Sequence, residues 1–150
     1  MKYMMMVKLD AKSEAAKSYE AGMQPDANLE TAMGKLIEQM TQAGVLLDMG
    51  GLLPVSKGAR IRAAGGKLVV TDGPFIESKE VIGGYAIIRA KSKEEAVEAG
   101  QDFMKLHLDI LGASYEGELE VRQMFDPAAF AAGGIENLAV SDGVINPVQN

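Results

Sequence analysis

Residues 2–10 read KYMMMVKLD. The run is shorter than a typical helix and rich in side chains that suit a strand, so it predicts a first β-strand that ends at Asp10. Its apolar side chains occupy consecutive positions, which is typical of a strand buried on both faces of a sheet. Residues 80–90, EVIGGYAIIRA, repeat this pattern, and their Gly83-Gly84 pair indicates a bulge or a close backbone approach.

Two helices are expected to cover one face of this sheet. The first follows Asp26, a candidate N-cap, and its apolar side chains recur at steps of three and four over residues 29–42. The second begins with the capping-box pattern of residues 92–95 and ends at Gly112. Residues 14–20 can form a further short helix.

The remaining strand signals complete the plan. Residues 45–49 predict a strand, residues 59–71 predict a hairpin across a glycine pair, and residues 118–125 alternate polar and apolar side chains. Along the chain, the predicted elements are a strand, a helix, a strand, a hairpin, a strand, a helix and a strand. This order predicts an α+β fold, a ferredoxin-like sheet with two helices on one face. The other face needs a cover, and a second copy of the chain is the economical one, because an isologous homodimer buries matching apolar patches.

One domain is expected over residues 1–126. The chain has 150 residues, 47% of them hydrophobic and 24% charged, which is typical of a single globular domain. Residues 127–150 are rich in Ala, Gly and Asn without a sustained period, so they are expected to form a C-terminal extension. Two alternatives stay open for this extension: a strap packed on the body or on a partner subunit, or disorder.

Composition excludes several function classes. A net charge of −6 without a basic block argues against nucleic acid as a partner. The apolar N-terminal run is broken at Lys8 and Asp10, too early for a membrane span. Cysteine is absent, which removes thiol chemistry and fits a reducing compartment, so the expected location is cytoplasmic.

Metal and cofactor sites are not expected either. The chain has one histidine, His107, so it cannot build a site from several histidines within one copy. The paired glycines do not occur in a dinucleotide-binding or P-loop frame. No organic cofactor and no metal are therefore predicted.

The densest cluster of polar and turn residues is Thr71-Asp72-Gly73-Pro74-Phe75, and we name residues 72–75 the DGPF loop. With the blocks around it, the cluster resembles the DGPF group of the YCII-related domain family. The resemblance covers most of residues 1–126. The other blocks that carry it are Lys2-Tyr3-Met4, residues 18–25, Ala43-Gly44-Val45-Leu46, Leu53-Pro54, Ser56-Lys57-Gly58-Ala59-Arg60 and Lys91-Ser92-Lys93-Glu94-Glu95-Ala96.

The resemblance implies a dimeric α/β barrel built from ferredoxin-like subunits, in a small cytoplasmic bacterial protein. Some relatives are linked to alternative sigma factors, which implies a regulatory protein partner as one alternative. The suspected site of the wider family pairs a histidine with an aspartate. Here the only histidine, His107, falls in the second predicted helix, which departs from that pattern.

Asp72 and His107 are the candidate catalytic residues. Asp72 can cap the amides of its own turn, or act as a desolvated general base or a ligand-orienting acceptor. His107 lies beside the apolar arc of its helix, so it is either a packing residue or an acid/base group oriented by a carboxylate.

The candidate ligand-binding residues are Tyr85, Phe75, Arg60 and Arg62. The Tyr85 hydroxyl can donate to a ligand or to a backbone carbonyl. Arg60 and Arg62 share one strand face, where they hold an anion or protect an exposed edge from aggregation.

These residues support two hypotheses of function. The first is a homodimer that binds an unidentified small molecule in a pocket between the sheet and the DGPF loop, with a catalytic version in which Asp72 acts as acid or base, assisted by Tyr85 or His107. The alternative is a protein-interaction or regulatory module linked to transcription, without catalysis.

Overall fold

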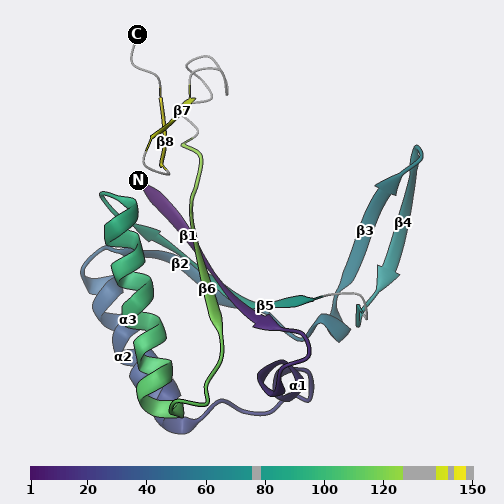
Figure 1. The fold of residues 1–150 in the computed structure, drawn as a ribbon, viewed down its shortest axis with the longest axis horizontal. Coiled ribbons are helices and arrows are strands. Elements are labelled where there is room, and N and C mark those ends of the chain that lie inside the picture. Colours follow the sequence, from purple (N-terminus) through teal and green to yellow (C-terminus); the bar gives the residue numbers. More distant parts are fainter. Residues whose placement is uncertain (76–78, 127–137, 142–143, 148–150) are drawn as a thin grey trace.

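The computed structural model describes residues 1–75, 79–126, 138–141 and 144–147. Figure 1 shows its helices and strands. The elements are β1 (Lys2–Asp10), α1 (Glu14–Glu20), α2 (Ala27–Gln42), β2 (Leu46–Gly51), the 3₁₀ turn η1 (Val55–Lys57), β3 (Ala59–Ala64), β4 (Lys67–Asp72), β5 (Glu80–Arg89), α3 (Lys93–Leu111), β6 (Glu118–Gln123), β7 (Leu138–Ser141) and β8 (Val144–Pro147).

The main sheet has four antiparallel strands in the order β2-β5-β1-β6. With α2 and α3, these strands follow one another along the chain as β-α-β-β-α-β, and the predicted α+β class is confirmed. The pairing of β1 with β5 shifts between Val7 and Lys8, opposite Gly83-Gly84, so the predicted bulge is present. Close backbone approach is present as well, since a Cβ on Gly84 would lie 3.0 Å from the carbonyl oxygen of Gly50.

Both long helices begin at the predicted caps. The Asp26 carboxylate accepts hydrogen bonds from the amides of Asn28 and Leu29 at 2.8 and 3.2 Å. The Ser92 hydroxyl accepts from the Glu95 amide at 3.1 Å, and the Glu95 carboxylate accepts from the backbone of Lys91. These side chains satisfy amide groups that have no partner inside the helix, which explains why the helices begin where they do.

Helices α2 and α3 lie side by side on one face of the sheet (Figure 1). Alternation along β1 turns Tyr3 and Met5 toward them, and Ile88 of β5 lies opposite Tyr3 on the same face. The buried core consists of Tyr3, Met5, Ile88, Ala90 and Ala96. The short helix predicted over residues 14–20 is confirmed as α1, and it lies beyond the end of β1 rather than beside α2 and α3.

The opposite face of the sheet, which we name the open face, carries no helix among the described residues. Strand register and alternation place on it Met4, Met6 and Lys8 of β1, Tyr85 and Ile87 of β5, Asp48 of β2 and Glu120 of β6. Met4, Met6, Tyr85 and Ile87 are half-buried in the single chain. The open face is therefore apolar along its centre and charged around it.

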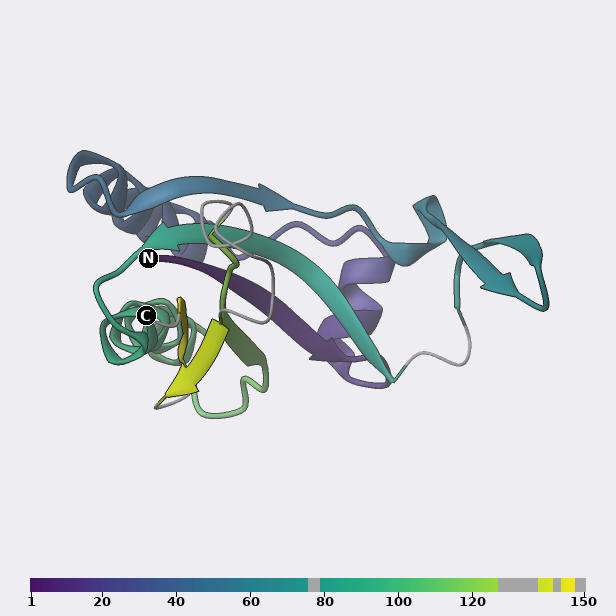
Figure 2. The same cartoon turned by 90° about the horizontal axis from the view of Figure 1, so that it is seen from above.

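Strands β3 and β4 form a separate two-stranded sheet, which we name the arm. Gly65 and Gly66 connect them with φ of 58° and 74°, and this left-handed geometry, which favours glycine, matches a tight hairpin turn. Figures 1 and 2 show the arm extending from the end of the sheet, away from α2 and α3. Every residue of both arm strands is exposed.

Within the C-terminal extension, β7 and β8 pair antiparallel as a second small hairpin. Residues 127–137, 142–143 and 148–150 lie outside the described residues, so the choice between a strap and disorder stays a prediction. Among the described residues, no helix is both long and apolar enough to cross a membrane.

Candidate functional site

Tyr85 and Asp48 form a polar pair on the open face. The Tyr85 hydroxyl donates to Oδ2 of Asp48 at 3.3 Å, between adjacent strands β5 and β2. The pair depends on Gly50, because a Cβ there would lie 2.9 Å from Cε1 of the Tyr85 ring. The hydroxyl thus points to a carboxylate, whereas the two predicted alternatives were a ligand and a backbone carbonyl.

Lys8 is the centre of a second polar group on the same face. Its Nζ lies 3.3 Å from Oε2 of Glu80 and 3.6 Å from Oε1 of Glu120, and its side chain is only 18% exposed. The hydrogen bond with Glu80 raises the pKa of Lys8, and the charges of Glu120, Glu80 and Glu118 raise it further. Lys8 therefore stays an ammonium cation at neutral pH and cannot serve there as a nucleophile or a general base.

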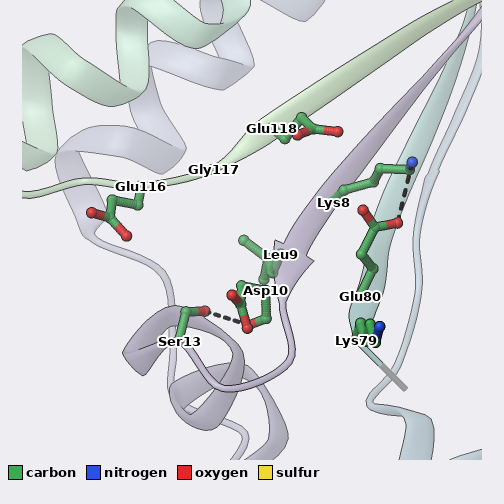
Figure 3. A pocket seen from close by; sticks show the side chains of 9 residues that line it. All are labelled: Lys8, Leu9, Asp10, Ser13, Lys79, Glu80, Glu116, Gly117 and Glu118. Atoms are coloured by element: carbon green, nitrogen blue, oxygen red, sulfur yellow. Dashed lines mark hydrogen bonds and ion pairs between the residues drawn. The ribbon is translucent and has the colours of Figure 1, made fainter. Parts of the chain in front are cut away.

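A cavity of about 380 Å³ opens beside Lys8, at the end of the sheet where β5 follows the DGPF loop along the chain. Figure 3 shows the Lys8 side chain pointing toward Glu80, with Glu116 on the far side of the cavity. Two ammonium groups and four carboxylates line it, together with Ser13. The lining residues are Lys8, Leu9, Asp10, Ser13, Lys79, Glu80, Glu116, Gly117 and Glu118.

Two of these polar residues already accept hydrogen bonds from nearby backbone amides. Asp10 accepts from the Lys12 amide at 2.8 Å, and Ser13 caps α1 by accepting from the Ala16 amide at 3.1 Å. Lys79, Glu116 and Glu118 are exposed, and, unlike the exposed Asp10 and Glu80, their side chains make no hydrogen bond or ion pair with another described residue, so a small molecule in the cavity can bind them.

Glu120 of the edge strand β6 lies on the open face. It forms ion pairs with Arg122 of the same strand and with Lys8 of β1. The hydrogen bond from Arg122 lowers the pKa of Glu120 below its usual 4.5, and the charges of Arg122 and Lys8 lower it further. A carboxyl whose pKa is lowered on folding adds stability above its unfolded pKa, and this stability is lost as the pH falls through the folded pKa.

We expect a Glu120→Gln variant to lose less stability than the wild type when the pH is lowered from about 5 to about 3, because Gln cannot be protonated in this range. Urea unfolding at each pH, followed by circular dichroism, measures the difference. If both proteins lose stability equally over this interval, the ion pairs of Glu120 do not stabilise the fold.

The DGPF loop lies at the base of the arm rather than on the open face. Asp72 is the last residue of β4 and is exposed, so the single chain does not desolvate its carboxylate. The guanidinium of Arg60 lies 4.0 Å from the centre of the Phe75 ring, which is a cation–π contact. Arg60 and Arg62 are two residues apart in β3, so they share one face of the arm, as predicted, opposite Thr71 and Val69 of β4.

Gly73 packs against η1 at the base of the arm. A Cβ on Gly73 would lie 1.8 Å from the carbonyl oxygen of Val55, and the Gly73 amide donates to the carbonyl of Gly58 at 2.9 Å. The Val55 amide in turn donates to the Glu20 carboxylate of α1 at 2.9 Å. The Gly73-Pro74 peptide bond is cis.

His107 takes part in packing on α3. Its Nδ1 lies 2.9 Å from the carbonyl oxygen of Phe103, and its ring packs in a tilted arrangement against Phe103 and Tyr115, with centroid distances of 4.6 and 5.2 Å. Because the carbonyl accepts, Nδ1 carries a proton in this contact. Helix α3 lies on the helix-covered side of the sheet, away from the arm, so the structure does not bring His107 to Asp72 (Figure 1).

Of the residues that the sequence singled out, the structure brings Arg60 into contact with Phe75 and places Arg62 on the same face of the arm as Arg60. Tyr85 lies on the open face, Asp72 at the arm base, and His107 on α3. The described residues contain no group of three His, Asp or Glu side chains suited to a metal ion. Sequence reasoning missed Asp48 and the group around Lys8, although a lysine within the apolar strand of residues 2–9 was a signal for the latter.

Comparison with known proteins identifies the family. The model of the YCII-related domain matches residues 1–105, which is more than half of the chain. An uncharacterised protein of Rhizobium meliloti is 36% identical over 61 residues, which are 41% of this chain. That alignment spans 49% of the relative, so about half of its length is matched. Since the match to the domain model begins at residue 1 and extends into α3, the chain belongs to the YCII-related domain family.

Proposed function

We propose that the protein is a homodimer that binds a small molecule on the open face, at the end of the sheet next to the DGPF loop. The observation that carries this proposal is the composition of that face: half-buried Met4, Met6 and Ile87 lie beside the Tyr85–Asp48 pair and the Lys8 group. An apolar floor with a few convergent polar groups is typical of a small-molecule site. A second copy of the chain turns this open floor into a closed pocket.

The charges around the cavity favour a polar ligand that carries an amine or several hydroxyl groups. Glu80 and Glu120 already neutralise Lys8, which leaves the exposed carboxylates of Glu116 and Glu118 as acceptors. Lys79 adds a donor at the same opening. The cavity itself meets the open face at Lys8 and is lined by polar residues apart from Leu9 and Gly117, and its volume of about 380 Å³ lies within the range of small-molecule sites.

Catalysis by Asp72 is the catalytic form of this proposal, and it depends on the second copy. A general base that works near neutral pH needs a raised pKa, and burial raises the pKa of a carboxyl group. Asp72 is exposed in the single chain, so a partner subunit has to provide that burial. If a folded Asp72→Asn dimer retains the turnover of the wild type, Asp72 is not the base.

A regulatory module is the second candidate function, and the arm is the observation that favours it. Its exposed apolar side chains, Ile61, Leu68 and Val70, are typical of a surface that binds another protein. In this alternative the chain holds no ligand, and a different protein covers the arm.

Native mass spectrometry of gently purified protein separates these functions, because one spectrum reports the subunit count and any retained molecule. A dimer with a bound molecule of defined mass is the expected result. A protein that is monomeric and without ligand, and that instead carries a different protein in stoichiometric amount, overturns the proposal in favour of the regulatory module.

We expect a Glu118→Gln substitution to weaken binding of an amine ligand roughly five- to tenfold, because it removes one charge-assisted hydrogen bond. Titration of the retained molecule, or of 1,4-diaminobutane as a probe, by isothermal calorimetry measures the change. Glu38→Gln, at an exposed position of α2, is the matched control and should leave the affinity unchanged. Equal affinities of Glu118→Gln and the wild type would place the ligand elsewhere.

A further inference from the structure

The arm is an amphipathic ribbon whose apolar face is exposed. Cross-strand pairing joins Ile61 to Val70 and Ala63 to Leu68 on one face, while Arg60 and Arg62 lie on the other. Ile61 is 70% exposed, Leu68 73% and Val70 64%. An isolated two-stranded hairpin is at best marginally stable in water, so this ribbon needs a surface to pack against.

The base of the arm determines the direction in which it extends. Gly73 packs against the Val55 carbonyl, Glu20 accepts from the Val55 amide, and Arg60 stacks on Phe75. These contacts connect the arm to α1 and η1 and hold it beyond the end of the main sheet (Figure 2). The apolar face of the arm is therefore presented to another molecule instead of folding onto its own body.

Charge indicates what that other molecule is. Residues 57–72 contain four basic side chains and one acidic side chain, which gives the arm region a net charge of +3. The whole chain carries −6, so the rest of it carries −9. The open face has a matching apolar centre, Met4, Met6 and Ile87, and both carboxylates and cations surround it, among them Glu120, Lys8 and Arg122. The charge match is therefore between the basic arm and the acidic body as a whole.

We infer that the arm of one copy packs its apolar face on the open face of a second copy, and that the second copy's arm does the same in return. Each copy has one arm and one open face, so the exchange closes as a symmetric dimer. Two arms packed on each other would bring like charges together, whereas an arm on a body brings opposite charges together. Charge thus favours the arm-on-body arrangement.

This inference rests on the homodimer of the proposed function and adds the element that covers the open face. The partner's Ile61, Leu68 and Val70 become the apolar wall opposite Met6 and Tyr85. The ligand site is then incomplete in a single copy, since one of its walls comes from the other subunit.

Cysteine crosslinking tests the arrangement directly, because the chain has no cysteine of its own. Leu68→Cys marks the arm and Met6→Cys marks the open face; one variant is labelled with ¹⁵N, and the two are mixed and treated with a short bis-maleimide. The expected result is a labelled–unlabelled dimer linked from residue 68 to residue 6. Met4→Cys replaces Met6→Cys if circular dichroism shows that the latter does not fold.

Glu38→Cys on the outer surface of α2 is the matched control, and it should not become linked to Leu68→Cys. Preferential linking of Leu68→Cys to itself would overturn the arrangement in favour of arms packed on each other. A dimer by native mass spectrometry without the link from residue 68 to the open face would also overturn it while leaving the homodimer in place. A monomeric wild type would overturn both the arm exchange and the homodimer.

Discussion

A Gly73→Ala substitution is expected to lower the free energy of unfolding by roughly 3 kcal/mol, the upper range for a side chain forced into a packed site. The added Cβ would lie 1.8 Å from the carbonyl oxygen of Val55 and 2.7 Å from its carbonyl carbon. Both are backbone atoms, which cannot turn aside as a side chain can. The Val55 amide is also held by Glu20, so relief of the clash breaks contacts between α1, η1 and the DGPF loop.

Gly58→Ala is the matched control for this prediction. Its Cβ would meet the same carbonyl oxygen of Val55 at 3.6 Å, which is an ordinary van der Waals distance. Urea unfolding, followed by circular dichroism, measures the free energy of unfolding of both variants. The comparison shows what a clash costs relative to an ordinary contact with the same oxygen atom. Equal stabilities would mean that the loop moves away without cost and that Gly73 does not hold the arm base.

The helices and strands of the main sheet could be predicted because each one carries a local signal. The caps at Asp26 and Ser92 satisfy amides within the next few residues, so their effect is visible in the sequence. The Gly65-Gly66 turn is equally local. The consecutive apolar residues in β1 are also a local signal, and the second surface that they favour on the open face stays a prediction.

The place of the arm could not be predicted in this way. A strand that alternates between two faces shows the same pattern whether its hairpin joins a sheet or projects from it. What holds the arm apart from the sheet is contact among Glu20, Val55 and Gly73, which come from three separate segments. The sequence around Asp72 shows only a local turn pattern, so the DGPF loop was expected beside the sheet, whereas it lies at the base of the arm.

The polar groups of the open face were missed for a related reason. Tyr85 meets Asp48 across 37 residues of sequence because β2 and β5 pair in one particular register. A one-residue change of register would turn one of the two side chains to the other face of the sheet. Periodicity alone does not determine that register, so the partner of the Tyr85 hydroxyl could not be identified before the structure was known.

A Val70→Asp substitution is expected to raise the dissociation constant of the dimer roughly 100-fold or more, which corresponds to about 2.7 kcal/mol. In a single copy Val70 is 64% exposed, so the new carboxylate should change the stability of the monomer by no more than about 0.5 kcal/mol. In the arm-exchanged dimer the same carboxylate loses its solvent where it packs against the apolar Met4 and Met6, which is costly. Sedimentation equilibrium over a range of concentrations measures the dissociation constant.

Val69→Asp separates this effect from a general effect of charge on the arm. Val69 is the neighbouring residue, has the same side chain and is 55% exposed, but it lies on the other face of the ribbon, opposite Arg62. Its carboxylate should stay in solvent beside the guanidinium and leave the dissociation constant nearly unchanged. If both variants weaken the dimer equally, the loss of positive charge explains the result, and the apolar face of the arm does not lie on the open face of the partner subunit.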